Sequence, residues 1–245
     1  MTSENAAAGE PQPAGMGEFS RIVGVFFEPA KTFADIAERH RWIAPMLLMK
    51  LASMSVTTAI SQRIGWERAW RHRMDIDPGL RKMTPEHRDQ TLATQVQWAS
   101  VAGYARAMVV APIIDVVFAA VLLGIAGAIM AFGIRFKQVF AVVCYGGLPG
   151  VISAIFTVVV IFLKNPGDVD IQNPLAFNAG AFMDPYTSWK FVHALAGALD
   201  LFTIWTILLI ATGLKAAAGK ELTFKGALVA VAVPWAIYVL LKFSI

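Results

Sequence analysis

The fold is decided by residues 191–214, FVHALAGALDLFTIWTILLIATGL, a continuous apolar stretch that contains one aspartate, Asp200. A helix needs about 20 apolar residues to cross the hydrocarbon layer of a bilayer. A carboxylate inside such a span costs about 3 kcal/mol or more, so it should face protein or water rather than lipid. The stretch therefore predicts a membrane-spanning helix whose aspartate points into a helical bundle.

The composition of the whole chain agrees with a membrane protein. Of its 245 residues, 57% are hydrophobic and 16% are charged, compared with about 45–50% and about 25% in soluble domains. The Lys and Arg residues that give a net charge of +4 lie in short segments beside apolar stretches. This pattern is typical of charges that flank membrane spans. We therefore expect a lipid bilayer as a partner and no nucleic acid.

The apolar stretches predict an all-α, polytopic membrane bundle with five transmembrane helices. A disordered tail is expected at residues 1–18, followed by a single membrane domain at 19–245. Residues 19–41 predict two interfacial amphipathic helices with their apolar side toward lipid; the alternative is a pair packed on the surface of the bundle. The spans are predicted at about 42–62, 108–134, 139–163, 191–214 and 227–243.

Prolines and glycines refine two of these spans. The helix that opens at Thr84 and Pro85 is expected to continue into the second span, with a kink at Pro112. The third span should break near its middle, where residues 146–150 read GGLPG.

Five spans place the chain termini on opposite sides of the membrane. With the N-terminus in the cytoplasm, the short basic segments around Arg135 and Lys220 are cytoplasmic too, as the positive-inside rule requires. Residues 63–106, which are also basic, then lie outside. We still predict this orientation, because the positive-inside rule weakens for longer segments and so residues 63–106 do not exclude it.

A second aspartate, Asp115, occupies an apolar stretch that runs in the same direction as that of Asp200. The two carboxylates are therefore expected at similar depth, with Lys50 of the first span as a candidate counter-ion. One hypothesis is a structural ion cluster that sets helix register. The other is a proton or cation relay, or the floor of a substrate cavity, which His193 could extend outward.

The second span also carries small residues at positions suited to helix packing. Ala120, Gly124 and Ala128 are spaced four apart, so they share one face and permit close approach of another helix.

No motif for chemistry is present. The sequence lacks HExxH, GxSxG, a P-loop and a dinucleotide-binding GxGxxG, and its single cysteine, Cys144, lies in an apolar run. We predict no catalytic residues, no cofactor and no metal site, and hence no enzyme.

Four stretches, FFEPAKTFADI, WIAPML, RFKQVFAVVCYGGLP and LDLFTIWTILLIATGL, resemble the Yip1 domain family of five-span membrane proteins. The resemblance covers residues 19–243 and implies an integral membrane protein with a cytosolic N-terminus. Eukaryotic members are associated with Rab GTPases and vesicle traffic. This chain has a short N-terminal tail and lacks their Asp-Leu-Tyr-Gly-Pro type signature, so Rab binding is not expected. It is more similar to the prokaryotic branch, which implies a bacterial cytoplasmic membrane.

Two functions remain open from the sequence. The first is a non-enzymatic membrane-organising or trafficking-like scaffold that acts through contacts with other membrane proteins, with itself or with lipids. The alternative is a small transporter or channel subunit that uses Asp115 and Asp200.

Overall fold

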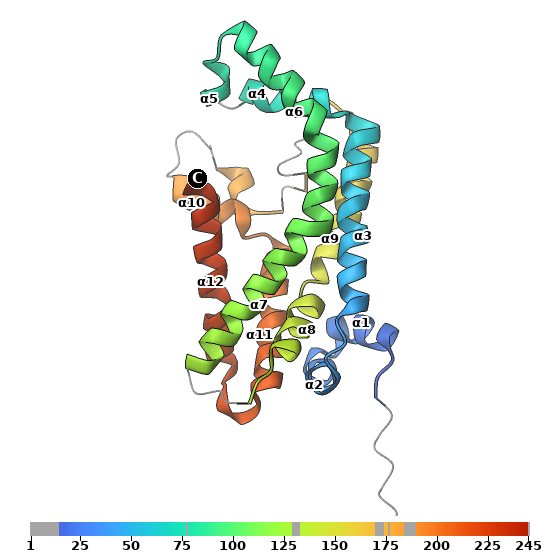
Figure 1. Cartoon of the computed structure of the whole chain (residues 1–245), viewed down its shortest axis with the longest axis vertical. Helices are drawn as coiled ribbons and strands as arrows, with labels where there is room; N and C mark the ends of the chain where they lie inside the picture. Colours follow the sequence, from blue (N-terminus) through green and yellow to red (C-terminus); the bar gives the residue numbers. More distant parts are fainter. Residues whose placement is uncertain are drawn as a thin grey trace, which may run out of the picture.

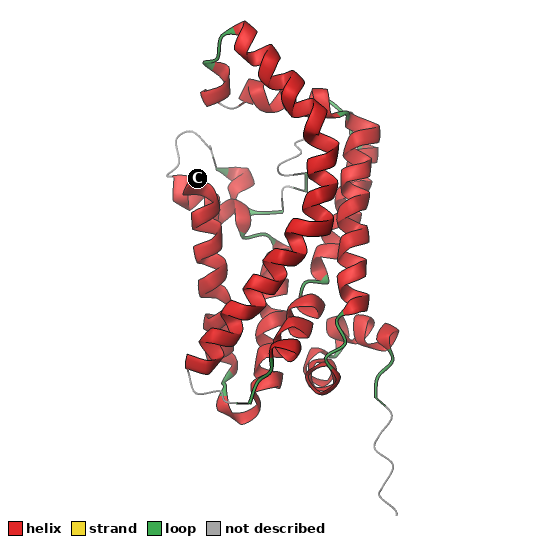
Figure 2. Cartoon of the chain, viewed as in Figure 1, coloured by secondary structure: helices red, strands yellow, loops and turns green. Residues whose placement is uncertain are grey.

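The protein is described here by a computed structural model that covers residues 15–76, 78–128, 133–169, 174–175, 177–183 and 190–244. Helices dominate this part of the chain, and none of its residues form a strand element (Figure 2). Within it, five helical stretches are long and apolar enough to cross a membrane: Ile43–Ile64, Pro85–Ala128, Phe136–Leu163, Leu201–Glu221 and Phe224–Leu241. The predicted all-α bundle with five spans is confirmed.

Two short helices, α1 (Glu18–Phe27) and α2 (Pro29–Arg39), precede the first span. Pro29 separates them, because it fits the first turn of α2 but cannot donate a backbone hydrogen bond to α1. The predicted disordered tail ends too late, since Glu18 already belongs to α1; residues 1–14 lie outside the described part.

The apolar face of α2 contacts the bundle, not lipid. Phe33 and Ile36 are fully buried, and α2 packs against two helices of the bundle, α8 and α11. Gly213 of α11 makes room for this contact, because a Cβ there would lie 2.7 Å from the Phe33 ring. The expectation of a lipid-facing α2 was therefore wrong, and the packed alternative holds. In α1, by contrast, Phe19 and Phe27 are about four-fifths exposed.

The first span combines α3 (Ile43–Ala59) with a π-helical turn, η1 (Ile60–Ile64). It leads away from α1 and α2 to the opposite end of the molecule, where α4 (Trp66–Ile76) and α5 (Pro78–Arg81) lie (Figure 1).

The second span is part of one long helix. It consists of α6 (Pro85–Ala105), a π-helical turn η2 (Arg106–Val110) and α7 (Ala111–Ala128). The Thr84 hydroxyl caps α6 by accepting from the backbone N–H of His87. Continuation of the Pro85 helix into the span is thus confirmed.

The third span is broken as predicted. α8 (Phe136–Gly146) ends in a turn at Gly147 and Leu148, and α9 starts at Pro149 and runs to Leu163. Gly146 lies against α11 so closely that a Cβ on it would come within 2.4 Å of the Ile210 side chain. Nearly all of α8 is buried, and it forms the centre of the core with α2, α7 and α11.

The fourth span is present, but its predicted start at residue 191 is wrong, because the helix breaks at Leu199 and Asp200. α10 (Lys190–Ala198) comes before the break and α11 (Leu201–Ala218) after it. The short helix η3 (Ala179–Phe182) packs on α10, where a Cβ on Gly180 would lie 2.7 Å from the backbone of Gly197.

The last span, α12 (Phe224–Ser244), follows α11 after a 3-10 turn, η4 (Gly219–Glu221). The lower end of α7, the start of α8 and η4 all lie at the end of the bundle that carries α1 and α2 (Figure 1). The upper end of α12 lies at the opposite end. The predicted grouping of the short basic segments with the N-terminal helices is therefore what the fold shows.

Candidate functional site

Asp200 caps the start of α11 and is not part of a helix. Its backbone is extended, with φ −97° and ψ 169°, and its carboxylate accepts hydrogen bonds from the backbone N–H and the hydroxyl of Thr203 at 2.8 and 3.2 Å. Aspartate is among the best N-cap residues, whereas in a helix interior it competes with the backbone. This preference explains the break.

The cap also changes the depth of Asp200. The 18 residues of α11 rise about 1.5 Å each, so the helix is about 27 Å long and nearly matches the hydrocarbon thickness of about 30 Å. Asp200 thus lies toward the membrane edge opposite α1 and α2. Asp115, in contrast, lies inside the continuous α7 helix.

The two carboxylates nevertheless line one cavity. Its volume is about 710 Å³, and its walls come from α7, the α8–α9 break, α11 and α12. Besides Asp115 and Asp200, its polar side chains are hydroxyls and an indole: Ser153, Thr203, Thr206, Tyr238 and Trp235. The remaining lining is apolar or glycine, and none of the described residues that line the cavity carries a positive charge.

Lys50 does not pair with either aspartate. Its ammonium donates a hydrogen bond of 3.0 Å to the backbone carbonyl of Met108 in η2. This carbonyl would normally accept from the N–H four residues later, but residue 112 is a proline and has none. Lys50 supplies the missing donor, and its charge acts on Asp115 only through space. The predicted role of counter-ion is therefore replaced by a backbone contact.

The small residues of α7 do not pack inside the chain. Ala120, Gly124 and Ala128 are exposed, and a Cβ on Gly124 would meet nothing within 4 Å. The buried face of α7 instead carries Ala119, Leu122 and Ala126, which contact the core. Within the described chain these small residues meet no other helix, so their role in helix packing stays a prediction that concerns contacts with another molecule. His193 lies in α10, but its side chain is outside the described part.

A second charged centre, which the sequence did not indicate, joins α1 and α2 to the bundle. Arg21 is 1% exposed, and its guanidinium binds Asp35 of α2 (Nε–Oδ2 2.6 Å) and Glu18 of α1 (Nη1–Oε1 3.1 Å). The Tyr145 hydroxyl of α8 donates to the other oxygen of Glu18 at 2.7 Å. Arg39 approaches Asp35 at 3.4 Å, so both acids have more than one partner.

The charge of Arg21 is held by this network. Burial on its own lowers the pKa of a cation, but the hydrogen bond and the negative charge of Asp35, together with Glu18, raise the pKa of Arg21 above its ordinary value. The guanidinium is therefore permanently charged and joins α1 to α2 by a charge-assisted hydrogen bond to Asp35, while Tyr145 joins α8 to the network through Glu18.

Comparison with protein families agrees with this architecture. The family model of the Yip1 domain matches residues 23–245. The chain belongs to the Yip1 domain family. A search of curated proteins and a search of solved structures each found no match. The matched region of this Yip1 domain protein includes α2, every span, and Asp115 and Asp200. Of the network around Arg21 it includes Asp35 and Tyr145 but not Glu18 or Arg21. It is thus an integral membrane protein with a Yip1 domain.

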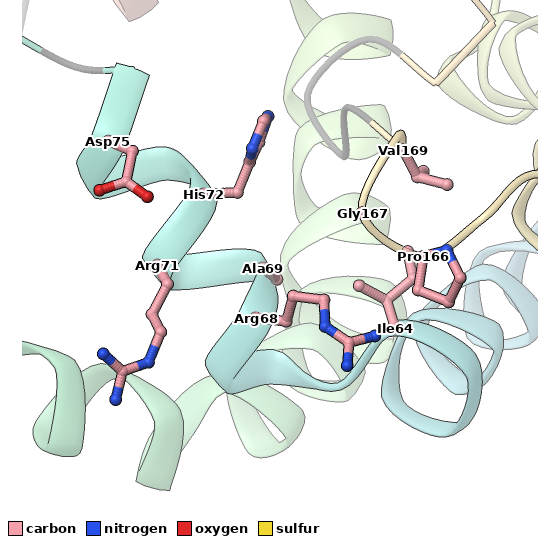
Figure 3. Close-up of a pocket in the computed structure, with 9 residues that line it drawn as sticks. All are labelled: Ile64, Arg68, Ala69, Arg71, His72, Asp75, Pro166, Gly167 and Val169. Atoms are coloured by element: carbon pink, nitrogen blue, oxygen red, sulfur yellow. The ribbon is translucent and has the colours of Figure 1, made fainter.

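A smaller recess of about 220 Å³ lies at the other end of this Yip1 domain protein, between α4 and residues 166–169. Figure 3 shows Arg68 extending toward Pro166, while Arg71 points away from it. Arg71 is held by Glu67 at 2.8 Å on the exposed surface of α4. The recess is lined by both charged and apolar residues and shares none of them with the 710 Å³ cavity.

The sequence contains the charged residues of the network around Arg21, but it does not show that they are neighbours. In the Yip1 domain protein, Arg21 shares the buried side of α1 with Val25, and Asp35 lies at the edge of the buried side of α2. A lone charge on an apolar helix face calls for a partner, but the sequence does not say which helix supplies it.

Proposed function

We propose that this Yip1 domain protein is a non-enzymatic membrane protein that organises other membrane proteins or lipids through contacts of its spans. The observation that carries the proposal is the second span. In its most apolar window only 11% of the residues are buried, the lowest share among the five spans of the described chain. Its bare face carries Ala120, Gly124 and Ala128, whose small side chains allow close approach of a helix from another molecule.

Photo-crosslinking in cells tests this proposal. A photoreactive amino acid at Gly124 should give adducts with another membrane protein or a second copy, whereas one at Ala119, which faces the core, should give none. A third position, Trp70 of α4, reports on contacts at the far end of the bundle. Recovery of lipid adducts alone from Gly124 would contradict a protein-organising role.

We further propose that the protein resides in a bacterial cytoplasmic membrane with its N-terminus in the cytoplasm. The orientation is supported by basic residues in two elements, Arg135 and Lys137 at the start of α8 and Lys220 in η4. Both elements lie at the end of the bundle that carries α1 and α2 (Figure 1).

Cysteine labelling in intact cells tests the orientation. The chain's only cysteine, Cys144, is fully buried, so it gives little background. With a membrane-impermeant maleimide, Lys164→Cys should react in intact cells and Lys220→Cys only after lysis. The reverse pattern would overturn the orientation.

The proposed partners are membrane proteins and lipids. Neither a nucleic acid nor a Rab-type GTPase is proposed, because the basic residues flank spans and the Rab-associated signature is missing from the sequence.

A second candidate function is a small transporter or channel subunit. It is favoured by one observation, the placement of Asp115 and Asp200 in the wall of a single cavity. In proteoliposomes, Asp115→Asn and Asp200→Asn should abolish a proton- or cation-driven flux, while Asp168→Asn, a change in an exposed loop, should not. Absence of flux for the wild-type protein would remove this candidate.

A further inference from the structure

The 710 Å³ cavity is open toward the bilayer. Its rim on α7 includes Ile114 and Val117, which are 39% and 56% exposed, and its rim on α12 includes Ile237 and Leu241, which are 51% and 58% exposed. Exposed apolar side chains on a membrane span face acyl chains. A molecule dissolved in the bilayer can therefore enter sideways, between α7 and α12, without crossing a polar surface.

The cavity is lined by two acidic side chains, and none of the described lining residues is positively charged. Asp115 has no hydrogen bond or ion pair with any described residue, and Lys50 uses its ammonium on the Met108 carbonyl. Each carboxylate oxygen of Asp200 accepts one hydrogen bond, both of them from Thr203. A carboxylate in such apolar surroundings is costly unless a cation joins it.

We propose that this cavity binds a long-chain amphiphile with a protonated amine as its head group. The ammonium, which has three donors, is bound at Asp115 inside α7, and Asp200 adds negative charge to the wall of the same cavity. Trp235 and Tyr238 add aromatic surface of the kind that attracts cations. The chain lies along the apolar rim of α7 and α12. The volume falls within the range of about 300–1,000 Å³ that is usual for ligand sites.

This proposal does not depend on the proposed role in organising membrane proteins. It names the class of ligand for the same cavity that the second candidate function, transport, would use. Binding requires no movement of the amine across the membrane. Amine binding without flux would support the proposal and remove the transport candidate. A flux of small cations without amine binding would support transport and overturn the proposal.

The test uses the full chain in nanodiscs of phosphatidylcholine. The probes are a hexadecylamine and a hexadecanol that carry the same photoreactive diazirine near the chain end, and labelled peptides are identified by mass spectrometry. The amine should label α7 and α12 at the cavity rim and be displaced by unlabelled hexadecylamine. The alcohol should label exposed faces of the spans without preference for the cavity.

Three variants distinguish the effect of the acidic side chains from the effect of the cavity volume. Asp115→Asn with Asp200→Asn should lower amine labelling at the rim at least tenfold, equivalent to about 1.4 kcal/mol. Gly150→Leu keeps both acids but fills the cavity, since a Cβ at Gly150 meets nothing within 4 Å, and should also lower labelling. Glu221→Gln, an exposed acid in η4, is the matched control and should label like wild type.

Two results would overturn the proposal. Equal rim labelling by the alcohol and the amine would show that the cavity selects apolar chains and that its acids are neutral. Unchanged amine labelling in both the double variant and Gly150→Leu would show that the amine binds elsewhere. Monodisperse elution of each variant confirms that it is folded.

Discussion

Replacing Arg21 with methionine should release α1 and α2 from the bundle. Methionine keeps most of the apolar stem but removes the guanidinium that binds Asp35 at 2.6 Å and Glu18 at 3.1 Å. Removal of one partner from a buried ion pair costs about 3–5 kcal/mol. The loss of stabilising free energy should be near the low end of this range, about 3 kcal/mol. Asp35 still pairs with Arg39, and Glu18, which is 35% exposed, still accepts from Tyr145.

Hydrogen exchange of the backbone amides measures this effect where it occurs. In nanodiscs, the amides of α1 and α2 exchange when these helices open locally. A loss of about 3 kcal/mol should speed their exchange by about 150-fold, since 1.36 kcal/mol corresponds to a factor of ten. Amides of α8 and α11 should change far less, because their core does not contain Arg21.

Lys31→Met is the matched control. Lys31 pairs with Glu28 at 3.0 Å with the same three-residue spacing as Arg21 and Glu18, but its side chain is 73% exposed and that of Glu28 60%. Such exposed pairs contribute about 0–1 kcal/mol, so exchange should rise by less than about fivefold. If Arg21→Met and Lys31→Met gave the same small increase, the reasoning that the buried network holds α1 and α2 would be refuted.

Three further changes test single contacts by thermal unfolding. Lys50→Met should lower the free energy of unfolding by about 1–3 kcal/mol, because it leaves the Met108 carbonyl unpaired. In a Pro112→Ala background the loss should be much smaller, because residue 112 then supplies the donor. Equal losses in the two backgrounds would contradict this account. Asp200→Ala should cost about 0.5–2 kcal/mol by loss of the cap, whereas Asp200→Ser should retain most of it. Gly213→Ala should cost about 1–3 kcal/mol, because its Cβ would lie 2.5 Å from a side chain of α8; Gly124→Ala, with nothing within 4 Å, should be neutral or stabilising.

Features that depend on local chemistry were predicted well. The break at Pro149, the cap at Thr84 and the continuous helix from Pro85 each follow from the hydrogen bonds that a few neighbouring residues can make. The number of spans also followed from apolar length alone.

The candidate site was predicted less well because its residues have competing roles. Asp200 could be a buried charge in a span or a helix cap, and both fit the same apolar sequence. Lys50 could bind an aspartate or a carbonyl, and only the position of η2 against α3 decides for Met108. The shared cavity of the two aspartates is a property of four packed elements, so no local pattern reports it.

The sequence by itself determined that this protein is a five-span membrane bundle, because lipid solvation imposes long apolar helices whose backbone groups pair within each span. Its resemblance to the Yip1 domain family rested on four short stretches, and the family match confirms it. The tertiary structure alone decided the partners of the charged groups. Arg21 binds Asp35 and Glu18, Lys50 binds a backbone carbonyl, and Asp115 and Asp200 line one cavity. The physical reason is that a charge in an apolar helix must be satisfied, but several partners are chemically equivalent, and packing selects among them.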